Sequence, residues 1–281
     1  MKNNIKTEIQ KIVNSANQKV VIANWKMNKK FNDIKDFCNT FNKLTGNDKV
    51  LKLSNTLVGV APTMLGLLPT TGLIKNNVVT VCQHVHYEKS GAITGQVSYD
   101  MVKEYKINHV IIGHSETRQM LNVSDEQINK TILTLLANDM VPVYCLGESI
   151  NDYNKNKSDA VITKQLKADL ANVDSNQILK VIIAYEPIWA IGSGKSATND
   201  FIAKMMKHIR NVLSEMYGKE VASKVRVLYG GSVKPANAKE ILAIKGVDGA
   251  LVGGAGLNPV DFYNIVISNP TYLKIKELKV K

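Results

Sequence analysis

The sequence predicts an α/β fold in which eight parallel strands form a closed barrel inside a ring of helices. Eight short runs of apolar and β-branched residues recur along the 281-residue chain, with helical patterns between them. The runs are apolar almost without interruption, which is typical of parallel strands buried on both faces. Eight strand and helix pairs in a chain of this length favour a closed (β/α)8 barrel over a doubly wound open sheet.

The predicted strands span residues 20–23, 57–60, 78–81, 109–112, 141–146, 181–184, 225–229 and 249–252. Helix signals lie between them. Ser124-Asp125-Glu126-Gln127 resembles a capping box, and Thr198-Asn199-Asp200 precedes an apolar stripe with helical spacing that ends at Gly218. The stripe contains Phe201, Met205, Ile209, Val212 and Met216. We interpret its methionines as core packing.

Residues 1–19 lie outside this alternation and form an N-terminal extension, whereas residues 20–281 form a single barrel domain. Ile5, Ile9, Ile12 and Val13 have helical spacing. They predict a short amphipathic helix packed against the barrel, with a disordered arm as the alternative.

Composition narrows the class of protein. Hydrophobic residues make up 44% of the chain, yet no apolar run approaches the roughly 18 residues of a membrane span, and the first residues lack a signal peptide's apolar stretch. The three cysteines form no Cys-x-x-Cys pair, so neither a disulfide framework nor a zinc site is indicated. We therefore expect a cytoplasmic protein.

The formal net charge of +12 raises the question of nucleic-acid binding. The 36 basic residues are spread along the chain, however, without a dense block interleaved with aromatics. We interpret most of them as solvated surface that also attracts an anionic substrate, and we expect no specific nucleic-acid partner.

The residues that follow the predicted strands carry the candidate chemistry, because in a parallel barrel they meet at one face. Glu186 follows one strand and precedes Pro187, Trp189 and a glycine-rich turn, which suggests a proton-transfer site beside a lid. Gly230-Gly231 and Gly253-Gly254 follow adjacent strands, where glycines let backbone N–H groups approach a phosphate.

Other strand ends are weaker signals when taken singly. A residue such as Lys26 is more often a surface charge, and one such as His114 is more often a structural histidine. Glu116 suits an ion pair, here opposite Lys26.

Taken together, five segments resemble the triosephosphate isomerase family. They occur in the family's order, from about Val20 to about Val266, at matching spacing. The segments are Asn24-Trp25-Lys26-Met27-Asn28, Gly113-His114-Ser115-Glu116, residues 184–195, Tyr229-Gly230-Gly231-Ser232 and Val252-Gly253-Gly254-Ala255. The resemblance implies a TIM barrel that interconverts dihydroxyacetone phosphate and glyceraldehyde 3-phosphate in glycolysis and gluconeogenesis, without a cofactor or a metal.

The resemblance also implies a role for each matching residue. The resemblance implies that Glu186 is the general base, that His114 polarises the carbonyl as a neutral imidazole, and that Lys26 supplies positive charge. The neutral histidine and the lid are features of the family. Asn24 and Trp25 are expected at the substrate, and Glu116 holds Lys26.

The implied phosphate site consists of backbone N–H groups from residues of small size. These residues are Gly192, Ser232, Gly253 and Gly254. Residues 187–195 form the implied lid, whose closure keeps water from an enediolate that can expel its phosphate. Residues 91–96, with Thr94, resemble the loop through which family members dimerise, so the chain is expected to be a homodimer.

Four positions depart from the family pattern. Thr117 stands where arginine is usual, although Arg118 follows, so we expect an altered salt bridge near the floor of the site. Gly256 replaces serine, and we expect a softer loop. His84 and Gln96 replace asparagine and glutamate near the expected interface.

Three alternatives stay open at this point. Residues 192–196 resemble the end of a nucleotide-binding P-loop, but that motif requires glycine where Trp189 stands. His84 and His86 suggest a metal site, for which no further ligands are evident. The third alternative is a basic barrel protein that binds nucleic acid or another acidic partner without catalysis.

Overall fold

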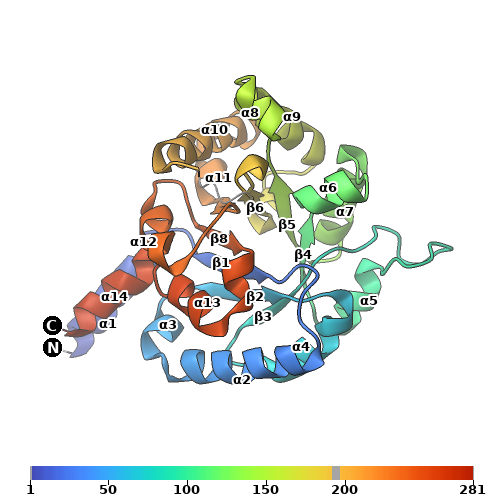
Figure 1. Ribbon diagram of the computed structural model, residues 1–281. Helices are drawn as coiled ribbons and strands as arrows, with labels where there is room; N and C mark the ends of the chain where they lie inside the picture. Colours follow the sequence, from blue (N-terminus) through green and yellow to red (C-terminus); the bar gives the residue numbers. More distant parts are fainter. Residues whose placement is uncertain (1, 192–196, 281) are drawn as a thin grey trace.

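The computed structural model describes residues 2–191 and 197–280, and within them eight parallel strands close into a barrel in chain order. Figure 1 shows the strands in the centre of the molecule with the helices around them. The strands are β1 Val20–Asn24, β2 Leu57–Ala61, β3 Val79–Cys82, β4 His109–Ile112, β5 Val141–Leu146, β6 Ile182–Tyr185, β7 Arg226–Tyr229 and β8 Gly249–Val252. The predicted fold is confirmed, and each predicted strand end lies within one residue of the observed one.

The strands bury both faces, which explains their continuous apolar sequences. Along β1, Val20 and Ile22 point into the barrel core, whereas Val21 and Ala23 belong to the layer between strands and helices. β1 also pairs with β8, with Val20 opposite Gly249, and this pairing closes the barrel. Every strand of this sheet therefore has a hydrogen-bonded neighbour on both sides, and the sheet has no free edge.

Helices follow the strands and cover the barrel. They are α1 Lys2–Asn14, α2 Phe31–Asn47, α3 Lys49–Leu53, α4 Leu67–Leu73, α5 Tyr99–Glu104, α6 Ser115–Met120, α7 Asp125–Ala137, α8 Ile150–Asn154, α9 Ser158–Asp169, α10 Asn199–Tyr217, α11 Lys219–Lys224, α12 Pro235–Ala243, α13 Pro259–Val266 and α14 Pro270–Val280. Short 3-10 helices span Met64–Gly66, Gln177–Lys180, Ile188–Ala190 and Gly254–Leu257. Within the described part of the chain, no helix is both long and apolar enough to cross a lipid bilayer.

Both predicted helix starts are confirmed by their hydrogen bonds. The Gln127 amide donates to the Ser124 hydroxyl at 3.2 Å while the Gln127 side chain accepts from the Ser124 amide, which completes the capping box of α7. Thr198 caps α10 by accepting from the Phe201 amide. Met205 is fully buried in α10, as expected for core packing.

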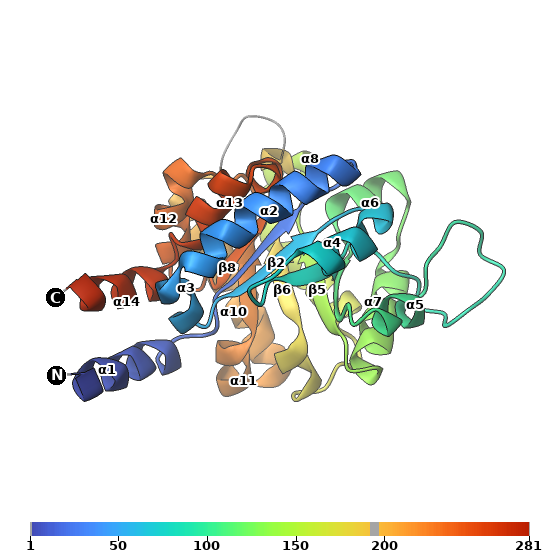
Figure 2. The same cartoon turned by 90° about the horizontal axis from the view of Figure 1, so that it is seen from below.

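The N-terminal residues form a helix, α1, but its main contact differs from the one expected. The element that α1 contacts most is α14, which follows the last helix of the barrel. Figures 1 and 2 show these two helices, one from each end of the chain, projecting from the same side of the molecule. α14 itself is anchored, because Ile275 is fully buried and the Asn269 side chain accepts from the Tyr272 amide. The chain ends are therefore held side by side.

Candidate active site

A cavity of about 370 Å³ lies where the strands end, and residues from several different strand ends line it. The lining includes Glu186 after β6, His114 after β4 and Lys26 after β1. The glycine-rich segments after β7 and β8 form another part of the wall. The full lining is Asn24, Trp25, Lys26, Asn28, His114, Glu186, Ala190, Ile191, Gly230, Gly231, Ser232, Val233, Lys234, Leu251, Gly253, Gly254, Ala255 and Leu257.

Glu186 is fixed at the end of β6 by contacts on both its backbone and its side chain. Its amide donates to Leu146 O at 2.8 Å, which extends the pairing of β5 and β6 by one residue. The residue is 1% exposed, and its carboxylate accepts from the Ser115 amide at 3.0 Å. A Cβ atom at Gly230 would lie 2.9 Å from Glu186 Cγ, so this wall needs glycine for the carboxylate to fit.

His114 faces this carboxylate directly. His114 Nε2 lies 2.9 Å from Glu186 Oε1, and Nδ1 accepts from the Glu116 amide at 3.2 Å. An acceptor at Nδ1 must carry a lone pair, which is compatible with a neutral ring whose single proton sits on Nε2. Burial alone would lower the pKa of His114, but the attraction of the nearby Glu186 carboxylate is stronger, so the net effect is a raised pKa. The protonation of this ring therefore depends on whether Glu186 stays beside it.

Lys26 occupies a strained backbone position. Its φ is +51°, a left-handed conformation that is uncommon outside glycine and is often found at functional sites. The Gln83 side chain donates to Lys26 O at 2.9 Å and to Ala61 O at 2.8 Å, and Asn24 Oδ1 accepts from the Lys26 amide. Lys26 Nζ lies 2.7 Å from Glu116 Oε1. These contacts direct the ammonium group to the cavity that Lys26 lines.

Trp25 borders the cavity with its indole ring turned to the protein interior. The residue is 0% exposed, and Nε1 donates to Gly256 O at 3.1 Å. The ring also packs edge-on against Phe37, with centroids 4.8 Å apart. Trp25 thus supports the wall of the cavity between β1 and the segment after β8.

The expected phosphate-binding residues lie together where the structure describes them. Ser232, Gly253 and Gly254 line the same cavity, and Gly254 begins the 3-10 helix Gly254–Leu257. Gly192 lies outside the described residues, as does the rest of the expected lid from residue 192 to residue 195. Lys234, which was not predicted as a site residue, also lines this wall.

The first part of the expected lid is attached to a buried carboxylate. Trp189 Nε1 donates to Glu148 Oε1 at 2.7 Å, and the Tyr185 hydroxyl donates to the same carboxylate at 3.1 Å. Glu148 is fully buried, and burial raises the pKa of its carboxyl. The Trp189 ring stacks on Tyr153 with centroids 4.2 Å apart. Glu148 was not predicted as a site residue, although it is a carboxylate that follows closely after a predicted strand, as Glu186 does.

Ion pairs are present near the floor of the site although Thr117 stands where the family usually has arginine. The Thr117 hydroxyl donates to His114 O at 2.8 Å, and Arg118 Nε donates to Gly113 O at 2.8 Å. Arg118 also pairs with Asp125 and with Asp169, each at 2.5 Å. Arg118 and Thr117 therefore both hold the segment that carries His114.

The departure at Gly256 has a packing cause. A Cβ atom at this position would lie 2.8 Å from Ala23 Cβ, closer than two such atoms pack. Gly256 is buried, and its carbonyl accepts from the Trp25 indole. We expected a softer loop here, but the glycine allows close packing of the segment after β8 on β1.

The loop that carries Thr94 projects from the opposite side to α1 and α14, between β3 and α5 (Figure 2). Residues 88–96 are exposed, including Thr94 and Gln96. At the base of the loop, a hydrogen bond joins the His84 and Gln96 side chains, while burial lowers the pKa of His84. The two departures from the family pattern therefore contact each other.

The two histidines at this loop lack the surroundings of a metal centre. His86 Nδ1 accepts from the Glu88 amide at 3.0 Å, and its ring stacks on Tyr87. Across residues 2–191 and 197–280, His, Cys, Asp and Glu side chains form no group of three or more suited to a metal ion.

The fold and the geometry of the cavity define a barrel enzyme with acid–base groups at the carboxyl ends of its strands. The family model described as triosephosphate isomerase matches residues 19–269. The chain therefore belongs to the triosephosphate isomerase family and is an isomerase.

Individual relatives agree with the family match. A triosephosphate isomerase of Mycoplasmoides gallisepticum is 40% identical over 249 residues, which cover 89% of this chain and 97% of the relative. One from Finegoldia magna is 42% identical over 249 residues, covering 88% and 97%. One from Streptococcus thermophilus is 43% identical over 244 residues, covering 86% and 94%.

Proposed function

We propose that this chain interconverts dihydroxyacetone phosphate and D-glyceraldehyde 3-phosphate, in glycolysis and gluconeogenesis, by proton transfer through an enediolate. The observation that carries the proposal is the 2.9 Å contact between Glu186 Oε1 and His114 Nε2 inside a cavity that Lys26 also lines. A base, a neutral hydrogen-bond donor and a cation meet there, and these are the groups needed to remove a proton beside a carbonyl.

In the proposed reaction, Glu186 removes a proton from the carbon next to the substrate carbonyl. The electron pair of that C–H bond forms the carbon–carbon double bond of the enediolate, and negative charge develops on the carbonyl oxygen. The hydroxyl proton of the enediolate passes to the former carbonyl oxygen, and Glu186 returns its proton to the neighbouring carbon, so that the other oxygen becomes the new carbonyl. Its carboxylate is bound by the Ser115 amide and faces His114, so the substrate has to take over its place beside Nε2.

His114 stabilises the developing charge by donating Nε2–H to the substrate oxygens. The Glu116 amide at Nδ1 supports this role, because it keeps the lone pair on Nδ1 and the proton on Nε2. Lys26 adds a positive charge to the same oxygens, held by Glu116 at 2.7 Å. Asn24 sets the conformation of Lys26 and Trp25 supports the wall beneath them.

The substrate phosphate binds, in this proposal, to backbone N–H groups of Ser232, Gly253 and Gly254, together with Gly192 of the lid. Backbone donors bind an anion without adding a base that would compete with Glu186. Closure of residues 187–195 over the cavity would exclude water and protect the enediolate from loss of phosphate. The glycines on this wall suit close approach of a phosphate to the main chain.

A coupled assay tests the proposal. Purified protein should convert glyceraldehyde 3-phosphate to dihydroxyacetone phosphate without added metal or cofactor, and Glu186→Gln should lower kcat by roughly 10²–10⁴-fold or more while the circular dichroism spectrum is unchanged. Glu104→Gln, a change of the same chemistry at an exposed residue of α5, is the matched control. Absence of conversion by the wild-type protein would contradict the proposal.

We further propose that the protein is cytoplasmic and forms a homodimer through the loop that carries Thr94. The exposure of residues 88–96 on a projecting loop supports the second point. A basic barrel that only held an acidic partner would not need a buried glutamate opposite a histidine, so catalysis is the better account of the cavity.

A further inference from the structure

The two ends of this chain form a structural unit that the family match does not include. The match covers residues 19–269, while α1 spans Lys2–Asn14 and α14 begins at Pro270. The aligned region already covers 97% of the Mycoplasmoides gallisepticum relative, so that relative has little chain left for such helices. In this protein they pack against each other. We call α1 and α14 together the terminal helix pair.

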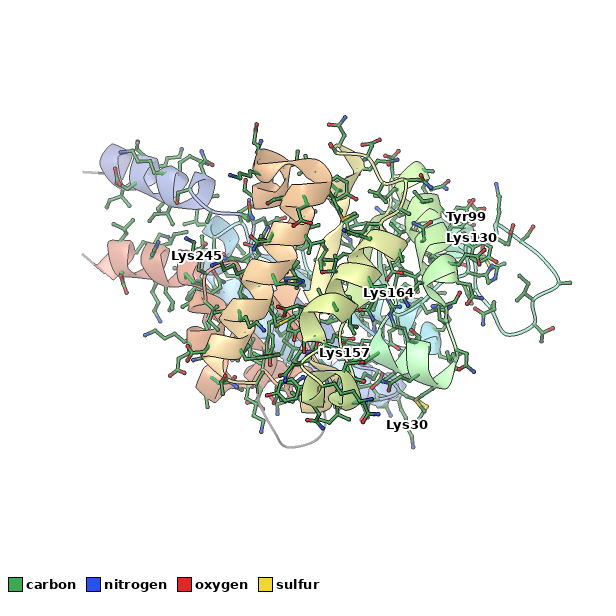
Figure 3. The ribbon with its side chains drawn as sticks, turned by 90° about the horizontal axis from the view of Figure 1, so that it is seen from above. Lys30, Tyr99, Lys130, Lys157, Lys164 and Lys245 are labelled. Carbon is green, nitrogen blue, oxygen red and sulfur yellow. The ribbon has the colours of Figure 1, made fainter. Side chains whose placement is uncertain are left out.

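The terminal helix pair concentrates positive charge. α1 and α14 together contain six lysines and two glutamates, a net charge of +4 out of +12 for the whole chain, on 13 and 11 of its 281 residues. The lysine side chains that the structure describes on these helices are all exposed. They are Lys6, Lys11, Lys274, Lys276 and Lys279. Elsewhere lysines such as Lys30, Lys130 and Lys245 lie on or beside separate helices, and Lys157 and Lys164 lie at α9 (Figure 3).

The apolar residues of the pair are used within the protein. Ile9, Ile12 and Val13 of α1 are half-buried, as are Leu273 and Leu278 of α14. Ile5, at 38% exposure, is the large apolar side chain that these helices leave exposed among those described. A bilayer-binding helix or a protein interface would need a larger apolar face or a central anchor.

The position of the pair leaves it accessible while the enzyme works. α1 leads into the amino end of β1, whereas the catalytic cavity lies at the carboxyl ends of the strands. In both Figures 1 and 2 the pair projects away from the loop that carries Thr94. Binding at the pair would therefore obstruct neither the cavity nor the proposed dimer interface.

We propose that the terminal helix pair is a binding surface for the phosphate backbone of nucleic acid. Exposed lysines on two projecting helices without an apolar anchor fit a partner that supplies dense negative charge and no specific pocket. Binding of this kind depends on charge, tolerates any base sequence and weakens steeply as salt rises, because each lysine–phosphate contact releases condensed counterions. This property is separate from the isomerase reaction.

The test is fluorescence anisotropy with a short labelled DNA duplex at a series of salt concentrations. The triple variant Lys6→Gln/Lys276→Gln/Lys279→Gln is compared with the control Lys157→Gln/Lys164→Gln/Lys167→Gln, which removes the same charge from exposed lysines at α9. Wild-type protein and the control should bind alike, while the terminal variant should bind about tenfold more weakly or worse and show a salt slope smaller by roughly 0.9 per lost contact. All three should retain isomerase activity.

Three outcomes would overturn the proposal. The first is absence of saturable binding at low salt. The second is an equal loss in both triple variants, which would assign the attraction to the overall charge. The third is binding to phosphatidylserine vesicles, or to an acidic polypeptide such as polyglutamate, without binding to the duplex.

Discussion

The Cβ atom of Ala23 packs directly against Gly256 and leaves no room for a side chain at position 256. A Cβ atom added to Gly256 would approach it to 2.8 Å, and the Trp25 indole binds the Gly256 carbonyl in the same layer. We therefore predict that Gly256→Ser destabilises the protein by about 1–3 kcal/mol, as overpacked cores do. Denaturant unfolding measures the effect.

A second variant distinguishes this contact from a general cost of serine in a turn. Ala23→Gly removes the atom that would clash, so the double variant Ala23→Gly/Gly256→Ser should lose less stability than the sum of the two single variants. Additive losses would show that Ala23 is not the residue that requires glycine at position 256.

Glu148 connects the start of the lid to the barrel, since both Trp189 and Tyr185 donate to its carboxylate. Glu148→Ala removes that acceptor and should cost about 2 kcal/mol of stability. It should also raise the catalytic barrier by about 1.4 kcal/mol, or roughly tenfold in kcat, through a poorly positioned lid. Glu148→Gln retains an acceptor oxygen and should have a smaller effect on both. Steady-state kinetics of the wild-type protein, Glu148→Ala and Glu148→Gln measure the effect on kcat. Equal kcat values in the three proteins would show that Glu148 does not position the lid.

Asp169 should make a recognisable contribution to the pH dependence of stability. Burial raises the pKa of Asp169 to about 6, although Arg118 and the Tyr144 hydroxyl lower it. The folded state thus holds this proton more tightly than the unfolded chain, whose carboxyl has the ordinary value of 3.8. The stabilisation is complete below about pH 4 and is lost as the pH rises through about 6.

The measurement compares wild type with Asp169→Asn. The difference in unfolding free energy, wild type minus variant, should fall as the pH rises from about 4 to about 6 and level off above it. Other carboxyls cancel in this comparison because both proteins share them. A difference that stays constant over this range would contradict the assignment.

The loop that carries Thr94 supplies a test of dimerisation. Thr94→Arg places a charged side chain on this exposed loop and should weaken a dimer by at least tenfold in Kd, which corresponds to a lost contact worth about 1.4 kcal/mol. Light scattering coupled to size exclusion reports the mass. Lys89→Ala, on the same exposed loop, is the control. A monomeric wild-type protein would contradict the predicted homodimer.

The barrel was predictable from sequence because its strands are short, apolar and evenly distributed along the chain. Strands such as β1 and β6 are buried on both faces, so each is a continuous apolar run, and the predicted strand ends lie within one residue of the observed ones. The candidate site was predictable for a related reason. Polar residues directly after such strands, Lys26, His114 and Glu186 among them, must converge in a closed parallel barrel.

Features that depend on contacts between distant residues were not predictable in this way. The Gln83 side chain, just after β3, donates a hydrogen bond to the main-chain carbonyl of Lys26, just after β1. Nothing in the sequence around Gln83 indicates that contact. The packing of Gly256 on Ala23 likewise becomes visible only once β8 lies beside β1. α1 was expected from its periodicity, but its contact with α14 joins opposite ends of the chain.

That contact has a practical consequence for protein engineering. Because α1 and α14 hold the two chain ends side by side, a short linker could join them and new termini could open in an exposed connection elsewhere. Such a circular permutant would still pair β1 with β8, so the cylinder and its cavity should form as before. The order in which the strands leave the ribosome would change, which makes this chain suitable for asking whether a closed barrel depends on that order.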